Sequence, residues 1–473
     1  MLITYVITPF IFAFLIGINN FLKNPIYIRR FAKFLYIIQF IFSCVLFFFA
    51  NTTSFEFQNI NLILDKNVQF LLLLTNFIFF LYSIISKAFI LKLHKLFYAT
   101  SFLLLAIIDF AILLDNIFIF LISLFWIILI NYFLSISFSK KEYTKQIKYQ
   151  LTNDLIWFFV AISLILYDFA RYFILNDIDF TFSNLNSNLD KIDSFSINYA
   201  FIGTLILVAK LFNLIPFNAK TLSLSNKINF CIYSLNFISN FILGYFLFLK
   251  LYTIFNHLFL EFQNEISIFL LVNFIIYVIL TFNQKNLFKF ITNAFCAITI
   301  LAFFLIFSIE ENYNAIFLYS ISTLFLSYCL SAFTFMILAN KFQTDNLDDF
   351  KKIEDKTRLS QIFTTFALLN IASTPLLPIF NSELIYFMAI FSNESEEALL
   401  NIAPYCFIFG IFIISLACFS ILYKIMIEPT QKSNTQVSFC IHQISVCLIL
   451  TIILGVIGMF PKHFLEQILL FIN

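Results

Sequence analysis

The sequence has few charged residues and few residues that break helices. Only 11% of its 473 residues are charged, less than half of the ~25% typical of soluble domains. Glycine occurs six times, proline eight times and histidine four times. The eight cysteines form no CxxC pair and no Cys/His spacing typical of a metal site, so we expect small buried apolar side chains there. These shortages argue against a soluble protein and against a metalloprotein.

Apolar residues make up 62% of the chain, and phenylalanine alone occurs 72 times. A bilayer core of ~30 Å needs about 20 apolar residues per helix. The sequence therefore predicts an all-α integral membrane protein of about fourteen transmembrane helices. The phenylalanine excess indicates an A+T-rich genome, as is common for organelle-encoded membrane proteins. The expected spans lie near 2–20, 34–50, 68–86, 96–114, 116–138, 154–175, 199–217, 228–252, 266–282, 290–309, 313–340, 360–390, 399–423 and 437–459.

Basic and acidic residues alternate between the loops that join these spans. The odd-numbered loops carry 22 of the 28 lysine and arginine residues, whereas the even-numbered loops are mostly acidic. Basic loops stay on the side of the membrane where the chain is synthesised. We therefore expect both termini on the opposite side. In a mitochondrial protein the basic loops face the matrix and both termini face the intermembrane space.

Two ionisable residues inside the predicted spans lie beside proline. Lys210 precedes Pro216 by six residues, and Glu383 follows Pro375 and Pro378. Ionisable groups at membrane depth are costly, so they indicate function. Proline frees backbone carbonyls that need a cavity or protein partners there. Broken helices with charges beside the breaks are typical of inverted-repeat ion carriers. The alternative is an ion pair that serves only packing.

Four stretches, in order, resemble the antiporter-like membrane subunits of respiratory complex I, and among them subunit 2 of NADH:ubiquinone oxidoreductase. The first leads from a predicted helix into the next, the second contains Lys210, the third contains the double proline, and the fourth closes the last helix. They cover most of the chain from about residue 100 to 465. The stretches are 116–149, 210–217, 347–380 and 454–461.

The resemblance implies two inverted five-helix repeats with broken helices 7 and 12. The implied segments are an N-terminal three-helix part, the two repeats and a last helix, at 1–95, 96–256, 257–425 and 426–473. The implied role is a proton-translocation half-channel in an NADH:ubiquinone reductase of the mitochondrial inner membrane. The subunit itself binds neither NADH nor quinone, and FMN, Fe-S clusters and ubiquinone lie elsewhere in the complex. Expected partners are other membrane-arm and accessory subunits and lipids such as cardiolipin, with no nucleic acid.

The sequence also departs from the family pattern. The family's helix 5 glutamate aligns with Phe125, and the helix 8 lysine falls near Asn240, which does not titrate. The histidine after the Pro-Phe pair is Asn218, and Glu383 replaces a helix 12 lysine, as in subunit 4. Asp109, one helix earlier, is expected to replace the missing carboxylate in part. The predicted proton-path residues are Lys210, Glu383, Asp109, Lys148 and Asn240, with helix breaks at Pro216, Pro375 and Pro378.

Two alternatives remain open at this point. A structural membrane-arm subunit that carries no protons would explain the missing titratable residues, and it predicts a dry, Phe-filled interior between helices 5 and 8. A subunit 4-like or stand-alone cation/proton antiporter would share the fold. Ordered water that links Lys210 to Glu383 would argue against the structural alternative.

Overall fold

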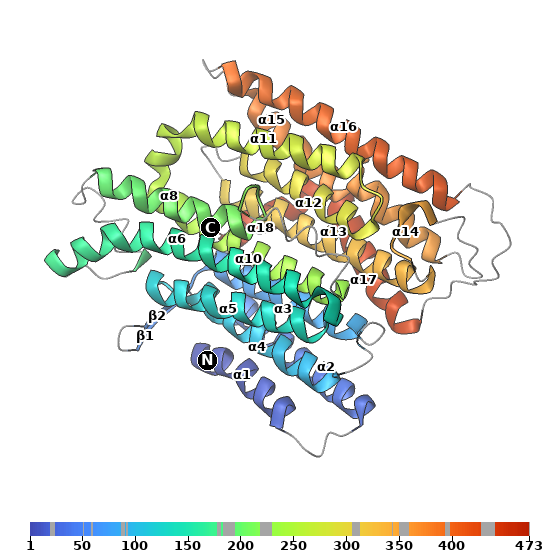
Figure 1. Cartoon of the computed structure of the whole chain (residues 1–473), viewed down its shortest axis with the longest axis horizontal. Coiled ribbons are helices and arrows are strands. Elements are labelled where there is room, and N and C mark those ends of the chain that lie inside the picture. Colours follow the sequence, from blue (N-terminus) through green and yellow to red (C-terminus); the bar gives the residue numbers. More distant parts are fainter. Residues whose placement is uncertain are drawn as a thin grey trace. The chain divides into compact units, whose positions relative to one another are not determined.

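The computed structural model shows a helical chain that divides into two compact units, Met1–Glu261 and Phe262–Asn473 (Figure 1). The all-α membrane fold expected from the sequence is confirmed. The division into four segments stays a prediction. The structure describes residues 1–18, 24–50, 52–57, 60–86, 90, 93–176, 181–182, 194–217, 229–304, 313–342, 344–349, 359–392, 398–426 and 440–472.

The described part of the first unit holds eight helices of four or more turns and one short hairpin. The hairpin is antiparallel and pairs Thr53 with Leu64; the sequence analysis did not predict it, because it is only five residues per strand in a polar loop. Asp65 then caps α3 by accepting a hydrogen bond from the Val68 backbone amide at 2.7 Å. The elements are α1 (Leu2–Ile18), α2 (Pro25–Phe49), β1 (Thr53–Phe57), β2 (Ile60–Leu64), α3 (Lys66–Ile85), α4 (His94–Leu113), α5 (Ile117–Ser137), α6 (Thr144–Asn176), α8 (Ser194–Leu211) and α10 (Phe230–Glu261).

The second unit is helical throughout its described part. Its predicted span at 360–390 is two helices separated by residues 372–377, as the two prolines indicated. Pro378 is the first residue of the second helix, where its missing N–H costs no hydrogen bond. The elements are α11 (Gln263–Phe282), α12 (Leu287–Phe304), α13 (Tyr313–Phe342), α14 (Leu359–Ile371), α15 (Pro378–Ser392), α16 (Ala398–Met426), α17 (Ile441–Met459) and α18 (Pro461–Ile472).

The described helices account for all fourteen predicted spans. Eleven are long and apolar enough to cross a membrane, and α1, α8 and α14 are shorter apolar helices. Helix α6 differs most from expectation, because it begins at Thr144 rather than near 154. Its first turns are polar, which hid the start of the helix from a search for apolar runs. As a result Asp154 lies inside the helix, not at its edge.

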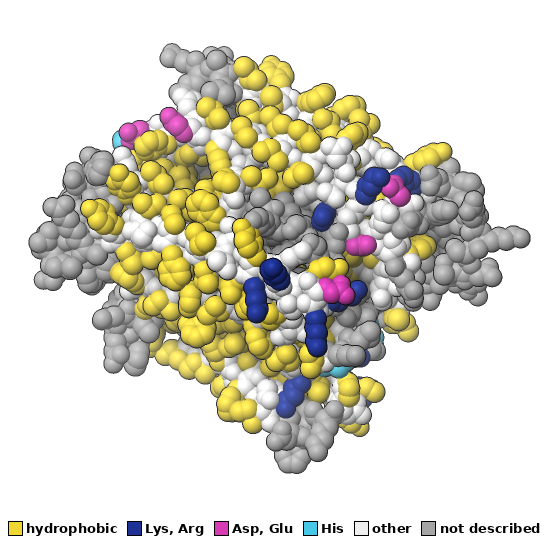
Figure 2. Space-filling model, viewed as in Figure 1, with side chains coloured by type: hydrophobic (Ala, Val, Ile, Leu, Met, Phe, Trp, Pro, Cys, Tyr) yellow, Lys and Arg dark blue, Asp and Glu magenta, His cyan; other side chains and the backbone are white. Residues whose placement is uncertain are grey.

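The apolar helices differ in how much of their surface the protein covers. The most apolar stretch of α13 is 100% buried, whereas that of α6 is only 17% buried. Apolar side chains dominate the face shown in Figure 2, as expected for a surface that contacts lipid. Helix α13 is therefore a core helix of its unit, and α6 is a peripheral one.

Asp348 joins the loop between α11 and α12 to the last turn of α16 in the second unit. Its carboxylate lies 2.7 Å from the Lys424 amine and 3.8 Å from the Lys285 amine. The hydrogen bond and charge of Lys424 hold the pKa of Asp348 below its usual range. Asp348 itself lies in a single 3₁₀ turn, Leu347–Asp349.

Candidate functional site

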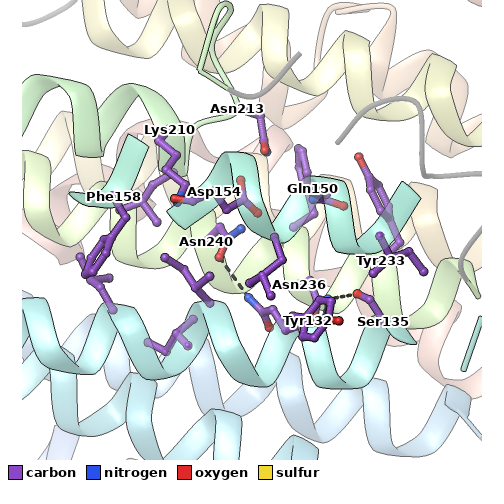
Figure 3. Close-up of a pocket in the computed structure, with 18 of the residues that line it drawn as sticks. Tyr132, Ser135, Gln150, Asp154, Phe158, Lys210, Asn213, Tyr233, Asn236 and Asn240 are labelled. Carbon is purple, nitrogen blue, oxygen red and sulfur yellow. Dashed lines mark hydrogen bonds between the residues drawn. The ribbon is translucent and has the colours of Figure 1, made fainter. Parts of the chain in front are cut away.

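A cavity of about 90 Å³ lies between α5, α6, α8 and α10 in the first unit (Figure 3). It has room for several water molecules, because one buried water needs only about 10–15 Å³ of such space. Its wall contains one lysine and one aspartate together with several amides and hydroxyls. The polar lining residues are Asn131, Tyr132, Ser135, Gln150, Asp154, Lys210, Asn213, Tyr233, Asn236 and Asn240.

Lys210 enters the cavity from the last turn of α8 and is only 6% exposed. Its amine donates a hydrogen bond to the backbone carbonyl of Asp154 on α6. The same amine lies 5.9 Å from the centre of the Phe158 ring, within the range of a cation–π contact. The predicted proton site is thus held by α6, through one carbonyl and one ring that are four residues apart.

Asp154 is the cavity residue that the sequence analysis missed. Its carboxylate and the Lys210 amine interact electrostatically across the α6–α8 packing. Its Oδ1 atom is buried and accepts no hydrogen bond from the described part of the chain. The available signal was spacing, because Gln150 and Asp154 are four apart and share one face of α6.

Amide side chains from α5 and α10 line the cavity opposite the lysine. Asn131 donates to Asn240 Oδ1 at 3.3 Å, and Asn236 donates to Ser135 Oγ at 3.3 Å. The Oδ1 atoms of Asn131 and Asn236 are buried and have no partner among the described atoms. Buried acceptors are normally satisfied by protein or by water. Together with Asp154 Oδ1, they indicate a hydrated cavity.

The cavity extends from Lys210 toward the basic-loop side of the unit. Ser135 lies two residues before the end of α5, and Tyr233 lies in the first turn of α10. The loop that follows α5 carries Lys140 and Lys141, both exposed. In Figure 3 the labelled Ser135 and Tyr233 lie together, away from Lys210. Water can therefore approach Lys210 from the side that holds the basic loops.

The opposite half of the same four helices encloses a small apolar space. It measures about 10 Å³, and its described lining is apolar except for Thr204. Phe120 near the start of α5 and Phe255 in the later part of α10 belong to this lining. An apolar space of this size stays dry. The four helices thus enclose a polar cavity on one side of Lys210 and an apolar space on the other.

An aromatic cluster occupies the position that aligns with the family's helix 5 glutamate. Phe125 stacks on Phe158 with ring centres 5.9 Å apart, and Phe158 faces the Lys210 amine. Phe125 is not among the residues that line the cavity. Position 125 is therefore one ring away from the amine and carries no charge.

Asp109 lies in a separate buried network of α1 to α4. Its Oδ2 atom accepts hydrogen bonds from the Tyr5 hydroxyl at 2.9 Å and from Asn76 at 3.2 Å. Gln39 of α2 approaches the same oxygen at 3.5 Å. The structure does not bring Asp109 to the Lys210 cavity, so it lies apart from the position where the sequence analysis expected it. Its role in a proton path stays a prediction.

The other sequence-predicted residues fall in different environments. Asn240 lines the cavity, whereas Lys148 is exposed on the first turns of α6 and does not line it. Pro216 follows the end of α8, and Asn218 lies outside the described residues. Among the described residues, no group of three His, Cys, Asp or Glu side chains could hold a metal ion.

Glu383 lies in the second unit, in the second turn of α15, and is 3% exposed. Its Oε1 accepts a hydrogen bond from Ser373 Oγ at 2.8 Å, so the break before α15 supplies its partner. On the same turn, Ser382 shares a hydrogen bond of 2.9 Å with Thr323 of α13. The break therefore positions the predicted outer proton site against hydroxyl groups of its own unit.

The breaks after α8 and after α14 have the same backbone hydrogen bonds. After α8, the Asn213 amide bonds to the Lys210 carbonyl at 3.0 Å and the Leu214 amide to the Ala209 carbonyl at 2.8 Å. After α14, the corresponding bonds join Ser373 to Asn370 and Thr374 to Leu369, both at 3.1 Å. Asn213 and Ser373 both have positive φ, 57° and 52°. Lys210 thus corresponds in backbone position to Asn370.

Comparison with solved structures finds chains of large membrane complexes. A chain of respiratory complex I from Thermus thermophilus with bound NADH has a TM-score of 0.82 at 12% identity, over 100% of both chains. A chain of the archaeal membrane-bound sulfane sulfur reductase has a TM-score of 0.84 at 14% identity, over 99% of this chain and 96% of that one. A chain of the Mrp complex from Dietzia sp. DQ12-45-1b has 0.85 at 11%, over 99% and 95%.

At these identities the similarity shows the fold and not the function. No protein-family model matches the chain, and no curated protein matches its sequence. The chain therefore has, over its full length, the membrane fold found in these respiratory and Mrp complexes.

Proposed function

We propose that this chain is a membrane-arm subunit of a respiratory complex and carries a proton half-channel centred on Lys210. The observation that carries the proposal is the polar cavity between α5, α6, α8 and α10, with its buried acceptors that have no described partner. A structural subunit predicts a dry, Phe-filled interior at this place, and phenylalanine is abundant enough to fill it. Instead, buried amides, a lysine and an aspartate face one another, which is costly unless they have a use.

The finer assignment follows the sequence resemblance. The complex would be a mitochondrial NADH:ubiquinone reductase, with this chain as subunit 2 and with other membrane-arm and accessory subunits and cardiolipin around it. FMN, Fe-S clusters and ubiquinone would belong to other subunits. The full-length fold similarity to a chain of complex I supports this proposal, as does the alternation of basic and acidic loops.

Replacing Lys210 with Met tests the half-channel. In membrane vesicles that carry the complex, we expect Lys210→Met to lower the number of protons moved per NADH oxidised, because the cavity loses its exchangeable cation. Lys250→Met is the matched control: Lys250 is also on a membrane helix of this unit, but it pairs with Asp65 at 3.4 Å and does not line the cavity. Unchanged pumping in Lys210→Met would favour the structural subunit.

Purification separates the complex from a stand-alone antiporter. We expect the chain to co-migrate with NADH dehydrogenase activity after mild solubilisation. A chain that migrates alone and exchanges cations for protons in vesicles would instead be an antiporter that shares the fold.

A further inference from the structure

We propose that Asp154 is the proton-exchange partner of Lys210, receiving protons from cavity water and passing them to the amine. The inference rests on the proposed half-channel. It assigns a role to a residue of α6 that the sequence pattern did not single out. Its starting point is charge: a buried ammonium group needs a nearby negative charge, and Asp154 is the carboxylate among the residues that line this cavity.

The two functional groups of Asp154 serve different purposes. Its backbone carbonyl accepts the hydrogen bond from the Lys210 amine and so fixes the amine beside this residue. Its carboxylate keeps one buried oxygen without a described hydrogen-bond partner and borders the same cavity as Gln150 and Asn213 (Figure 3). The carboxylate therefore borders the cavity from which it can take a proton, and it lies near enough to the amine for the two charges to interact.

The close packing of α6 on α8 keeps this arrangement in place. Gly203 of α8 approaches α6 so closely that a Cβ there would lie 2.8 Å from the Ala161 carbonyl oxygen and 3.0 Å from Leu164 Cβ. Only glycine permits this approach without a shift of one helix. Asp154 lies two turns before Ala161 on α6, and Lys210 lies two turns after Gly203 on α8. The exchange pair is thus set by a backbone contact two turns away.

The proton step balances without any other reactant. A hydronium ion that enters the cavity gives a proton to the Asp154 carboxylate, which leaves a water molecule and a neutral acid. The acid O–H then passes that proton through cavity water to the neutral Lys210 amine, so the lysine becomes ammonium and the aspartate returns to carboxylate. The net charge of the pair rises from −1 to 0, and onward release of the proton from Lys210 restores −1. No step places two like charges in the cavity.

The test compares four variants by proton movement in vesicles that carry the complex. We expect Asp154→Asn to slow proton transfer by about 10²-fold or more and to flatten its pH dependence, while Asp154→Glu retains most of both. The double variant Asp154→Asn with Phe125→Glu is expected to recover part of the transport, because position 125 is one ring away from the amine. Asp65→Asn serves as the control. It removes a carboxylate outside the cavity, and the asparagine oxygen can still cap α3.

The outcomes separate this inference from the proposed function. If Asp154→Asn pumps like the parent while Lys210→Met does not, the half-channel stands and the role of Asp154 is wrong. If both variants pump like the parent, the half-channel itself is wrong. Should Asp154→Asn fail to assemble, as judged by the native size of the complex, Asp154→Ser is measured instead with the same expectations. Failure of Asp154→Glu to support transport in an assembled complex would also overturn the proposal.

Discussion

The breaks after α8 and after α14 have the same backbone conformation, but their side chains differ in chemistry. Each has a residue of positive φ three positions after the last polar helical residue, with the same pair of backbone hydrogen bonds. At the break after α8 that polar residue is Lys210, which faces a cavity and an aspartate. At the break after α14 it is Asn370, which donates to Ser327 Oγ at 2.7 Å, and the ionisable group is Glu383, beyond the break. The backbone geometry is thus the same at both breaks, but the ionisable residue precedes the first break and follows the second.

A glycine of a neighbouring helix packs against each break. A Cβ on Gly244 of α10 would lie 2.9 Å from Leu211 Cβ, and one on Gly458 of α17 would lie 2.4 Å from the Leu376 carbonyl oxygen. Asn381 also donates to the Gly458 carbonyl at 2.7 Å. Two of only six glycines therefore stand where a helix approaches a broken segment. The packing is tighter at the second break, because Gly458 there faces a backbone carbonyl oxygen rather than a side chain.

Exchanging the residues at the equivalent positions should have the largest effect. Asn370→Lys places a cation where the structure has an amide that is 0% exposed, and an uncompensated buried charge costs about 3–5 kcal/mol. Lys210→Asn removes a charge instead and should keep the fold. Thermal unfolding of the solubilised protein measures both. Equal unfolding temperatures for Asn370→Lys and the parent would mean that the second break already provides a counter-charge.

Adding a methyl group behind each break should give the next largest effect. We expect Gly458→Ala to destabilise the protein by about 1–3 kcal/mol, as overpacking does. We expect Gly244→Ala to cost less, because its nearest obstacle is a Cβ at 2.9 Å rather than a backbone oxygen at 2.4 Å. Gly455→Ala is a matched control on the same helix, since nothing lies within 4 Å of its added Cβ. A larger loss for Gly455→Ala than for Gly458→Ala would contradict this account of the breaks.

Removing buried carboxylates distinguishes the breaks from the rest of the fold. Glu383→Gln keeps an acceptor for Ser373 but cannot exchange a proton, so we expect proton movement to fall while the fold remains. Asp109→Asn also keeps an acceptor for Tyr5, and because its network lies outside the cavity we expect a smaller loss of transport. The ratio of protons to electrons in vesicles measures both. A larger loss for Asp109→Asn would place it on the path, as the sequence analysis predicted.

The smallest effect should come from the charges outside the membrane. The lowered pKa of Asp348 means that its ionised form is favoured in the folded state. Its stabilising contribution is therefore present above the ordinary aspartate pKa of about 3.9 and is lost as the pH falls through the lower folded value. We expect a small difference in unfolding temperature between Asp348→Asn and the parent that is constant down to about pH 4 and shrinks below it. A difference that grows in acid would contradict the ion pair with Lys424.

The sequence predicted the features that depend on composition and on proline. The length of the apolar stretches predicted the helices, and the two prolines predicted the break before α15. Lys210 and Glu383 were predicted as functional residues because ionisable residues are rare inside membrane spans. It did not predict Asp154, because the polar first turns of α6 placed this residue at the edge of the expected span. It also could not place Asp109, since a four-residue polar network across α1 to α4 depends on which faces of these helices pack together. Pairs of polar residues four apart, such as Asn236 and Asn240, could have predicted the polar face of a helix that lines the cavity.

The polar cavity and the apolar space on the two sides of Lys210 have an electrical consequence for the proposed half-channel. In the proposed half-channel, water in the polar cavity would carry the potential of the basic-loop side up to the amine. The membrane voltage would then fall mainly across the apolar layer that contains Phe120 and Phe255. Moving one charge through the full drop is worth about 2.3 kcal/mol per 100 mV. In the proposed half-channel, a proton on Lys210 would therefore have crossed little of the electric field. The remaining step, past the apolar residues, is the one in which respiration would do its electrical work.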